Sequence, residues 1–160
     1  MEHVIVEATK TGNHLDPTAY LNLLPTLADA LPPGARAFAT DPDHYDFYST
    51  RCVKDLTLDT LQHGDTDGEG WLRLGFRHNC WKHEEDLSLR YTGVRGLDLG
   101  DFGPSRWSGI GALTLDEILP HEHGFSHQID FRAGSLTVVS RDLAAKWTPA
   151  DDCRTCERGS

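Results

Sequence analysis

The feature that most limits the fold of this chain is an alternation of apolar and polar residues in its middle part. Side chains of a β-strand point to opposite faces in turn, so this period of two predicts half-buried antiparallel strands. The alternating apolar positions are Leu72, Leu74 and Phe76 in residues 71–78, and Leu87, Leu89 and Tyr91 in residues 86–94.

A hairpin is predicted near the end of the chain. Residues 125–132 (FSHQIDFR) place every second apolar residue on one face, and Ala133-Gly134 makes a tight turn into residues 135–140 (SLTVVS). We interpret residues 51–62 as a further strand, residues 3–9 as a short strand, residues 112–119 as a strand or a short helix, and residues 141–147 as one closing helical turn.

One helical segment is predicted near the N-terminus. Asp16-Pro17 is a good helix start, because Asp caps free N–H groups and Pro suits the first helical position. Apolar residues then recur at helical spacing as far as Leu31, with Pro25 predicting a kink or two short helices. Pro32-Pro33-Gly34 is expected to end the segment, which would cover one face of the sheet.

Together these patterns predict an α+β fold, mainly an antiparallel β-sheet with a short N-terminal helical segment packed on one face. The chain has 160 residues, of which 38% are hydrophobic and 25% charged, a composition typical of a globular domain. We expect a single domain over residues 1–150 and a charged C-terminal tail over residues 151–160.

The balance of charge limits the partners. A formal net charge of −10 argues against a nucleic-acid partner, because phosphate binding needs a basic face, and it favours a basic protein partner or simple solubility. No apolar run is long enough to span a membrane, and the N-terminus does not resemble an export signal. Arg outnumbers Lys, which suggests a bacterial source, so we expect a cytoplasmic bacterial protein.

Four cysteines are expected to be reduced in that compartment. Cys52 and Cys80 lie in apolar segments and are interpreted as buried thiols. Cys153 and Cys156 form a C-x-x-C pair in the tail without a second pair of ligands that would complete a zinc site. We therefore assign the pair to a frayed terminus, which leaves open whether it has a function.

The sequence predicts neither a calcium site nor a nucleotide-binding site. Residues 65–70 (DTDGEG) begin like an EF-hand loop, but the twelfth position is Phe76 where a bidentate carboxylate is needed, so an acidic hairpin turn is predicted instead. The glycine-rich nucleotide-binding patterns and the nucleophile elbow are absent from the sequence.

A histidine cluster offers the alternative of a metal site. His121, His123 and His127 have H-x-H-x3-H spacing, and neutral imidazoles bind zinc, iron or nickel. The H-x-H resembles the cupin metal motif, with Gln128 where a cupin has its glutamate. Pro120 and Gly124 favour a turn instead, and the second cupin motif is absent, so no cofactor is expected unless this cluster binds metal.

An acidic recognition surface is the other candidate site. Glu84, Glu85 and Asp86 follow His78, Cys80 and His83, a group that we interpret as a connection between strands, although a Cys near a His is also found in nucleophilic catalysis. Together with Asp116 and Glu117 these acids would form a negative surface, with Trp71 or Trp107 as anchors for a protein partner.

Residues 86–143 carry a resemblance to a known class of protein. A strand with a Y-x-G-V pattern (LSLRYTGV) is followed by a hairpin with an H-[EQ]-I-x-F-x-x-G-x-L-x-V pattern (HQIDFRAGSLTV). This arrangement resembles small uncharacterised bacterial proteins and immunity-type proteins that neutralise bacterial toxins. The resemblance implies paired strands and no catalytic residue.

Two hypotheses follow. The first is a cytoplasmic protein-binding module, in its most concrete form an immunity-like inhibitor whose acidic face binds a basic toxin surface. The alternative is a small cupin-like, metal-dependent enzyme that uses His121, His123 and His127.

Overall fold

A computed structural model describes residues 1–100 and 109–151 of the chain. These residues form two helices, a two-stranded sheet and a six-stranded antiparallel sheet, which confirms the predicted α+β fold dominated by antiparallel strands. None of the helices in these two ranges is long and apolar enough to cross a membrane. The predicted tail beyond Asp151 lies outside the described residues.

The six-stranded sheet has the order β3-β4-β5-β8-β7-β6. Its central strand pair is β5 with β8, although these two strands are separated in the sequence by the β6–β7 hairpin. The strands are β3 (Thr57–Thr66), β4 (Glu69–Arg77), β5 (Glu85–Asp98), β6 (Leu113–His121), β7 (Gly124–Phe131) and β8 (Gly134–Pro149).

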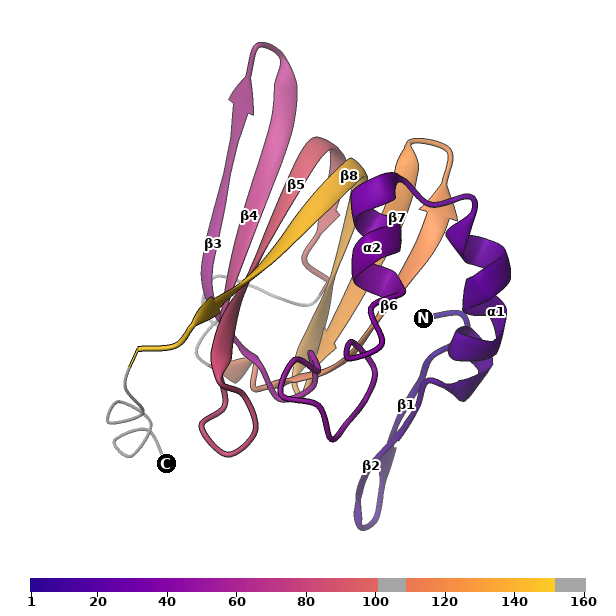
Figure 1. The fold of residues 1–160 in the computed structure, drawn as a ribbon, viewed down its shortest axis with the longest axis vertical. Coiled ribbons are helices and arrows are strands. Elements are labelled where there is room, and N and C mark those ends of the chain that lie inside the picture. Colours follow the sequence, from indigo (N-terminus) through magenta and orange to yellow (C-terminus); the bar gives the residue numbers. More distant parts are fainter. Residues whose placement is uncertain (101–108, 152–160) are drawn as a thin grey trace.

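Two helices cover one face of this sheet, α1 (Thr18–Ala28) beside β6 and α2 (Pro33–Ala39) in front of β8 (Figure 1). The Asp142 carboxylate on β8 accepts hydrogen bonds from the N–H groups of Gly34 (3.1 Å) and Ala35 (2.9 Å), which lie in the first turn of α2. A Cβ on Gly34 would lie 1.8 Å from the Leu143 carbonyl oxygen, so only glycine allows α2 to approach the sheet this closely.

The core lies on the sheet face that the helices cover, which we call the covered face. The core residues of the sheet are the apolar residues of the alternating patterns. All six apolar positions predicted from 71–78 and 86–94 are at most 2% exposed. Strand β6 differs, because residues 113–118 are buried without interruption. The loop of residues 40–56 covers part of the same face, and its buried Val53 and Leu56 extend the core.

The N-terminal part contains one strand more than predicted. Strands β1 (Ile5–Thr9) and β2 (Gly12–Asp16) form a separate hairpin. Asp16 accepts a hydrogen bond from the Thr18 N–H (2.9 Å), and α1 begins at Thr18 with Pro17 as its N-cap, one residue later than predicted. Pro25 lies inside α1, which continues without a break to Ala28.

Three local predictions are wrong. Pro32-Pro33-Gly34 begins α2 rather than ending the helical segment, because Pro is well suited to a first helical turn. The predicted strand over 51–62 begins only at Thr57, since the loop before it packs on the core. Residues 141–147 continue β8 as a strand, because pairing with β5 outweighs the helical preference of the two alanines there.

Candidate functional site

A buried, hydrogen-bonded network of polar side chains surrounds Asp116 on β6. The Asp116 carboxylate oxygens lie 2.8 and 2.9 Å from His44 Nε2, and one of them lies 2.7 Å from His127 Nε2. His127 Nδ1 in turn lies 2.7 Å from the Tyr91 hydroxyl. These four residues are at most 1% exposed, so their side chains are shielded from solvent.

The partners of His44 fix its protonation state. Its Nδ1 lies 2.8 Å from the Phe38 carbonyl oxygen, and its Nε2 faces the Asp116 carboxylate. The carbonyl only accepts, and so does the Asp116 carboxylate, which its lowered pKa keeps ionised, so both ring nitrogens donate and the ring is an imidazolium. His127 bridges the Asp116 carboxylate and the Tyr91 hydroxyl, so both nitrogens of this second ring have a hydrogen-bond partner. The network is therefore a buried ion pair of His44 and Asp116, extended by His127 and Tyr91.

The pKa directions of His44 and Asp116 agree with a buried ion pair. Burial by itself lowers the pKa of His44, but the adjacent charge of Asp116 and the hydrogen bonds outweigh burial and raise that pKa above its ordinary value. Burial raises the pKa of Asp116, yet the charge of His44 and the hydrogen bonds from both histidines hold it far below the usual range. Burial also raises the pKa of the Tyr91 hydroxyl well above its usual value.

The network joins three parts of the chain and is closed to ligands. The loop of residues 40–56 supplies His44 and also Tyr45, whose hydroxyl donates to the Asp116 backbone carbonyl (3.0 Å). The Tyr20 hydroxyl of α1 donates to the Ile118 carbonyl (2.7 Å). Since every donor and acceptor named here is satisfied and buried, the arrangement serves to fix the loop and the helix on the sheet.

Glu117, the next residue, holds the N-terminal segment. Its carboxylate accepts backbone hydrogen bonds from Glu2 (2.8 Å), His3 (2.7 Å) and Val4 (2.8 Å). Asp116 and Glu117 are 1% and 3% exposed, so neither can contact a partner protein. Their assignment to an acidic surface is wrong, because β6 is covered on both faces and both acids are used inside the fold.

The remaining acids of the predicted surface lie at the start of β5. Glu84 is exposed, whereas Glu85 makes a two-point ion pair with Arg51 (Nε–Oε1 2.7 Å, Nη2–Oε2 3.2 Å). Asp86 lies 2.7 Å from His78 Nδ1. Two of these three acids are therefore bonded to partners within the chain. Trp107, the predicted anchor, lies outside the described residues.

The three histidines of the predicted metal site do not come together. His121 and His123 are exposed at the β6–β7 turn with ring centroids 5.4 Å apart, whereas His127 is buried with both nitrogens bonded to Asp116 and Tyr91. Residues 1–100 and 109–151 contain no group of three or more His, Cys, Asp or Glu side chains that could hold a metal ion. The cupin-like site is therefore not formed, because the strand pleat turns His127 into the core.

The cysteines differ from the expectation as well. Cys52 is a buried free thiol, as predicted, and burial raises its pKa. Cys80 is disulfide-bonded, so the expectation of a reduced thiol is wrong at this position and Cys80 offers no nucleophile. Cys153 and Cys156 lie outside the described residues.

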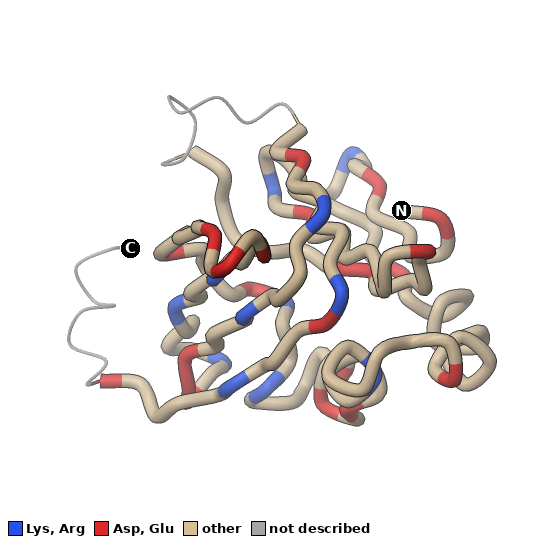
Figure 2. The backbone as a smooth tube through the Cα atoms, turned by 90° about the horizontal axis from the view of Figure 1, so that it is seen from above, with Lys and Arg blue, Asp and Glu red and all other residues tan. Residues whose placement is uncertain are grey.

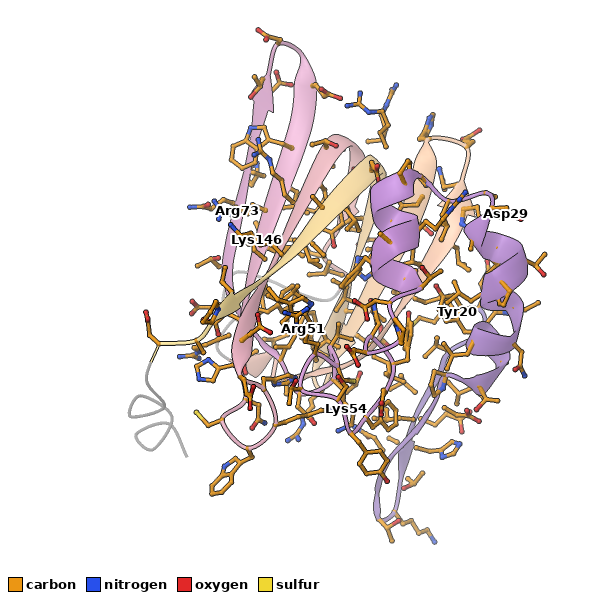
Figure 3. The ribbon with its side chains drawn as sticks, viewed as in Figure 1. Tyr20, Asp29, Arg51, Lys54, Arg73 and Lys146 are labelled. Carbon is orange, nitrogen blue, oxygen red and sulfur yellow. The ribbon has the colours of Figure 1, made fainter. Side chains whose placement is uncertain are left out.

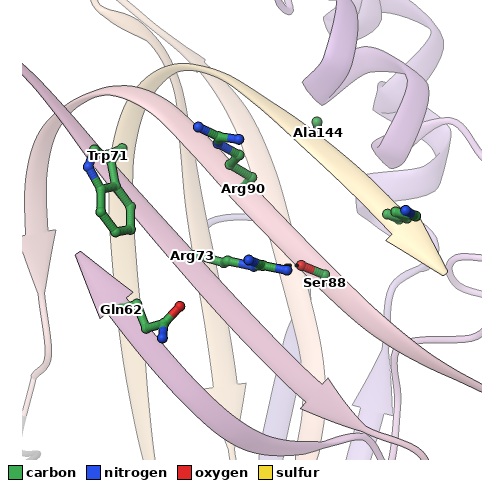
Figure 4. A pocket seen from close by; sticks show the side chains of 7 residues that line it. Gln62, Trp71, Arg73, Ser88, Arg90 and Ala144 are labelled. Atoms are coloured by element: carbon green, nitrogen blue, oxygen red, sulfur yellow. Dashed lines mark hydrogen bonds between the residues drawn. The ribbon is translucent and has the colours of Figure 1, made fainter. Parts of the chain in front are cut away.

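The face of the sheet turned away from the helices carries a different kind of site. A groove of about 390 Å³ crosses four neighbouring strands there (Figure 4). Figure 3 shows Arg73 and Lys146 on this side of the sheet, which we call the open face. The groove is lined by Gln62, Trp71, Arg73, Ser88, Arg90, Ala144 and Lys146.

Strand register explains how the groove is built. Gln62, Arg73, Arg90 and Ala144 form one row across β3, β4, β5 and β8, and Ser88 lies opposite Lys146 in the next row. The Trp71 indole lies over Gly64, where a Cβ would be 2.8 Å from the ring. Small residues therefore line the bottom of the groove, and the long side chains form its walls.

The groove concentrates positive charge in an acidic protein. Arg73 and Arg90 lie directly opposite each other on paired strands, an arrangement that is unfavourable because like charges repel at this spacing. No acidic side chain lines the groove, and within residues 1–100 and 109–151 neither these two arginines nor Lys146 takes part in an ion pair. Elsewhere both signs of charge are distributed around the chain (Figure 2).

Sequence reasoning missed this site for an identifiable reason. From the sequence, the polar halves of the half-buried strands are expected only to face solvent, and Lys146 falls within the predicted closing helical turn. A signal was present, since the polar positions of residues 71–78 are Arg73, Gly75 and Arg77, with no acid among them.

Comparison of the chain with protein-family models, with curated proteins and with solved structures gives no match.

Proposed function

We propose that this chain is a protein-binding module that recognises an acidic segment of a partner through the groove on its open face. The observation that carries the proposal is the facing pair Arg73 and Arg90, with Lys146 on the next strand and no acid among the lining residues. Cations placed this way destabilise the free protein, and a bound carboxylate would remove that cost.

A basic partner, as expected from the net charge, has less support. Of the five acids assigned to that surface and described here, Asp116 and Glu117 are buried, and Glu85 and Asp86 bond to Arg51 and His78. The groove instead provides arginines, which bind carboxylates at two points, and the Trp71 ring as an apolar contact. An immunity-like inhibitor is still the concrete form proposed, with the charges of the two partners reversed.

A nucleic-acid partner is less favoured than an acidic protein segment. A nucleic acid extends its phosphate charge far beyond the groove, and the net charge of −10 would repel it there. A short acidic segment confines its charge to the groove itself.

The test is a calorimetric titration with a synthetic peptide of alternating Glu and Thr, at low and at high salt. The double variant Arg73→Glu/Arg90→Glu should lose affinity by roughly a hundredfold or more, because each substitution turns an attraction into a repulsion. The matched control is Lys10→Glu/Arg95→Glu, which changes the net charge equally at two exposed positions outside the groove. This control should lose only a few-fold in affinity.

Three results would contradict the proposal. The first is no binding of the peptide at low salt, and the second is an equal loss in both double variants. The third is displacement of the peptide by single-stranded DNA at equal charge concentration, which would assign the groove to nucleic acid.

A further inference from the structure

Strand β3 forms one edge of the six-stranded sheet, and no strand within residues 1–100 and 109–151 pairs with its outer side. It pairs only with β4, and no backbone hydrogen bond joins residues 57–66 to any other described segment. Figure 1 shows the outer side of β3 free of both helices and of the β1–β2 hairpin. A row of unpaired N–H and C=O groups on an edge strand is a template for a further strand.

Features that discourage the pairing of a further strand occur at only one end of the β3 edge. A β-bulge interrupts the register between Leu58 and Thr60, with the exposed Asp59 as the extra residue, and bulges and charges both discourage strand addition. Beyond the bulge, residues 60–66 run in regular register with β4. This stretch contains no Lys, Arg or Pro, and its only formally charged residue is Asp65.

The cationic groove begins at this same edge. Gln62 of β3 stands directly beside Arg73, and Gly64 stands beside Trp71, whose indole leans across the glycine. A strand added outside β3 would place its open-face side chains next to Gln62 and Gly64. Carboxylates at these positions would lie within reach of the Arg73 side chain. The Trp71 indole would contact the residue opposite Gly64.

We infer that the acidic segment binds as an added strand along residues 60–66 of β3, with acidic side chains at alternate positions pointing into the groove. This inference rests on the proposed function and adds the backbone mode of recognition. Main-chain hydrogen bonds to β3 would supply affinity, and the arginine row would select for acid at every second residue.

A second copy of this chain fits the edge less well. Antiparallel pairing of two β3 strands about Gln62 would set Asp59 opposite Asp65 of the other copy. Centring the pair on His63 would set Asp59 opposite Asp67 instead. Either register brings like charges together between two chains that each carry a net charge of −10. A partner with few charges on its other face meets no such repulsion.

Hydrogen exchange of the full chain, read residue by residue, tests the inference. Saturation with the alternating Glu and Thr peptide should slow the exchange of every second amide within residues 60–66, by about tenfold or more. Amides of β6, at the other edge of the sheet, should be unaffected. Two further peptides of the same sequence carry backbone N-methyl groups at alternate residues, one in each of the two frames. The peptide methylated on the side that faces β3 should bind about tenfold more weakly or worse, although its charge is unchanged.

The outcomes separate this inference from the proposed function. If all three peptides bind equally and the Arg73→Glu/Arg90→Glu variant binds none, the groove is confirmed and strand addition is overturned. If no peptide binds, the proposed function itself fails. Concentration-dependent protection of residues 60–66 in the free protein would assign the edge to self-association and overturn the inference.

Discussion

The two faces of the six-stranded sheet handle charge in opposite ways. On the covered face, Asp116 and Glu117 are almost fully buried, and each finds its partners inside the chain, in His44 and His127 or in the N-terminal backbone. On the open face, Arg73, Arg90 and Lys146 are exposed, and none has an acidic partner among the described residues. Charge that is satisfied internally stabilises a fold, whereas charge left unsatisfied at the surface is available to a ligand.

The largest effect is expected when the charge of the buried Asp116 carboxylate is removed, and this change tests the comparison most directly. Asp116→Asn should lower the free energy of unfolding by about 3–5 kcal/mol, because it leaves the His44 imidazolium buried without its counter-charge. Urea unfolding measures the change. The control is Asp59→Asn, an exposed acid, for which a change within about 0.5 kcal/mol is expected. A similar small change for Asp116→Asn would show that the network does not hold the fold together.

The same network predicts a pH window. The pKa of Asp116 is depressed in the folded state, so its contribution is present above the unfolded pKa of about 4 and is lost as pH falls through the folded value. The pKa of His44 is raised, so its contribution is complete below the unfolded pKa of about 6.5 and is lost as pH rises through the folded value. The stability difference between the wild type and Asp116→Asn should therefore be largest between about pH 4 and pH 6.5.

Nitrogen chemical shifts provide an independent check of the pH argument. In NMR spectra at pH 7, both ring nitrogens of His44 should carry protons, as its two acceptor partners require. A neutral His44 ring at that pH would contradict the buried ion pair.

Replacing the second buried acid should have a smaller effect. Glu117→Gln keeps the shape of the side chain but weakens three charge-assisted hydrogen bonds, so the free energy of unfolding should fall by about 1.5–3 kcal/mol. Hydrogen exchange at residues 2–4 should accelerate more than exchange in β4. Unchanged exchange at residues 2–4 would show that the carboxylate does not hold this segment.

On the open face, replacing a charged side chain should raise the free energy of unfolding instead of lowering it. Arg90→Glu turns a repulsive pair with Arg73 into an attractive one, so the free energy of unfolding should rise by about 0.2–1 kcal/mol while binding of the acidic peptide weakens. Thermal unfolding and calorimetry measure the two quantities in one sample series. A variant that loses both stability and binding would show that Arg90 supports the fold, and the contrast between the faces would disappear.

The alternating strands could be predicted from the sequence because their period reflects burial on one face. Residues 71–78 and 86–94 correspond closely to β4 and the first part of β5. The end of β8 could not be predicted, because Ala144, Ala145 and Lys146 favour a helix locally and are held as a strand only by pairing with β5.

The functional residues were less predictable, for two physical reasons. The burial of Asp116 depends on His44, which lies 72 positions earlier and has no pattern in the sequence that links it to β6. The groove depends on the lateral order of four strands, and this order places β8 beside β5 rather than beside β6. A sequence read one strand at a time shows neither relationship.

The central place of β8 has a consequence for how the chain is made. The β3–β4–β5 meander and the β6–β7 hairpin precede β8 in the sequence, yet they join into one sheet only through it. During synthesis on the ribosome, both pieces must therefore wait with open edges until residues 134–149 have emerged from the exit tunnel. Nascent chains in that interval would be exposed to aggregation, and chaperones that shield sheet edges would be expected to raise the yield of folded protein.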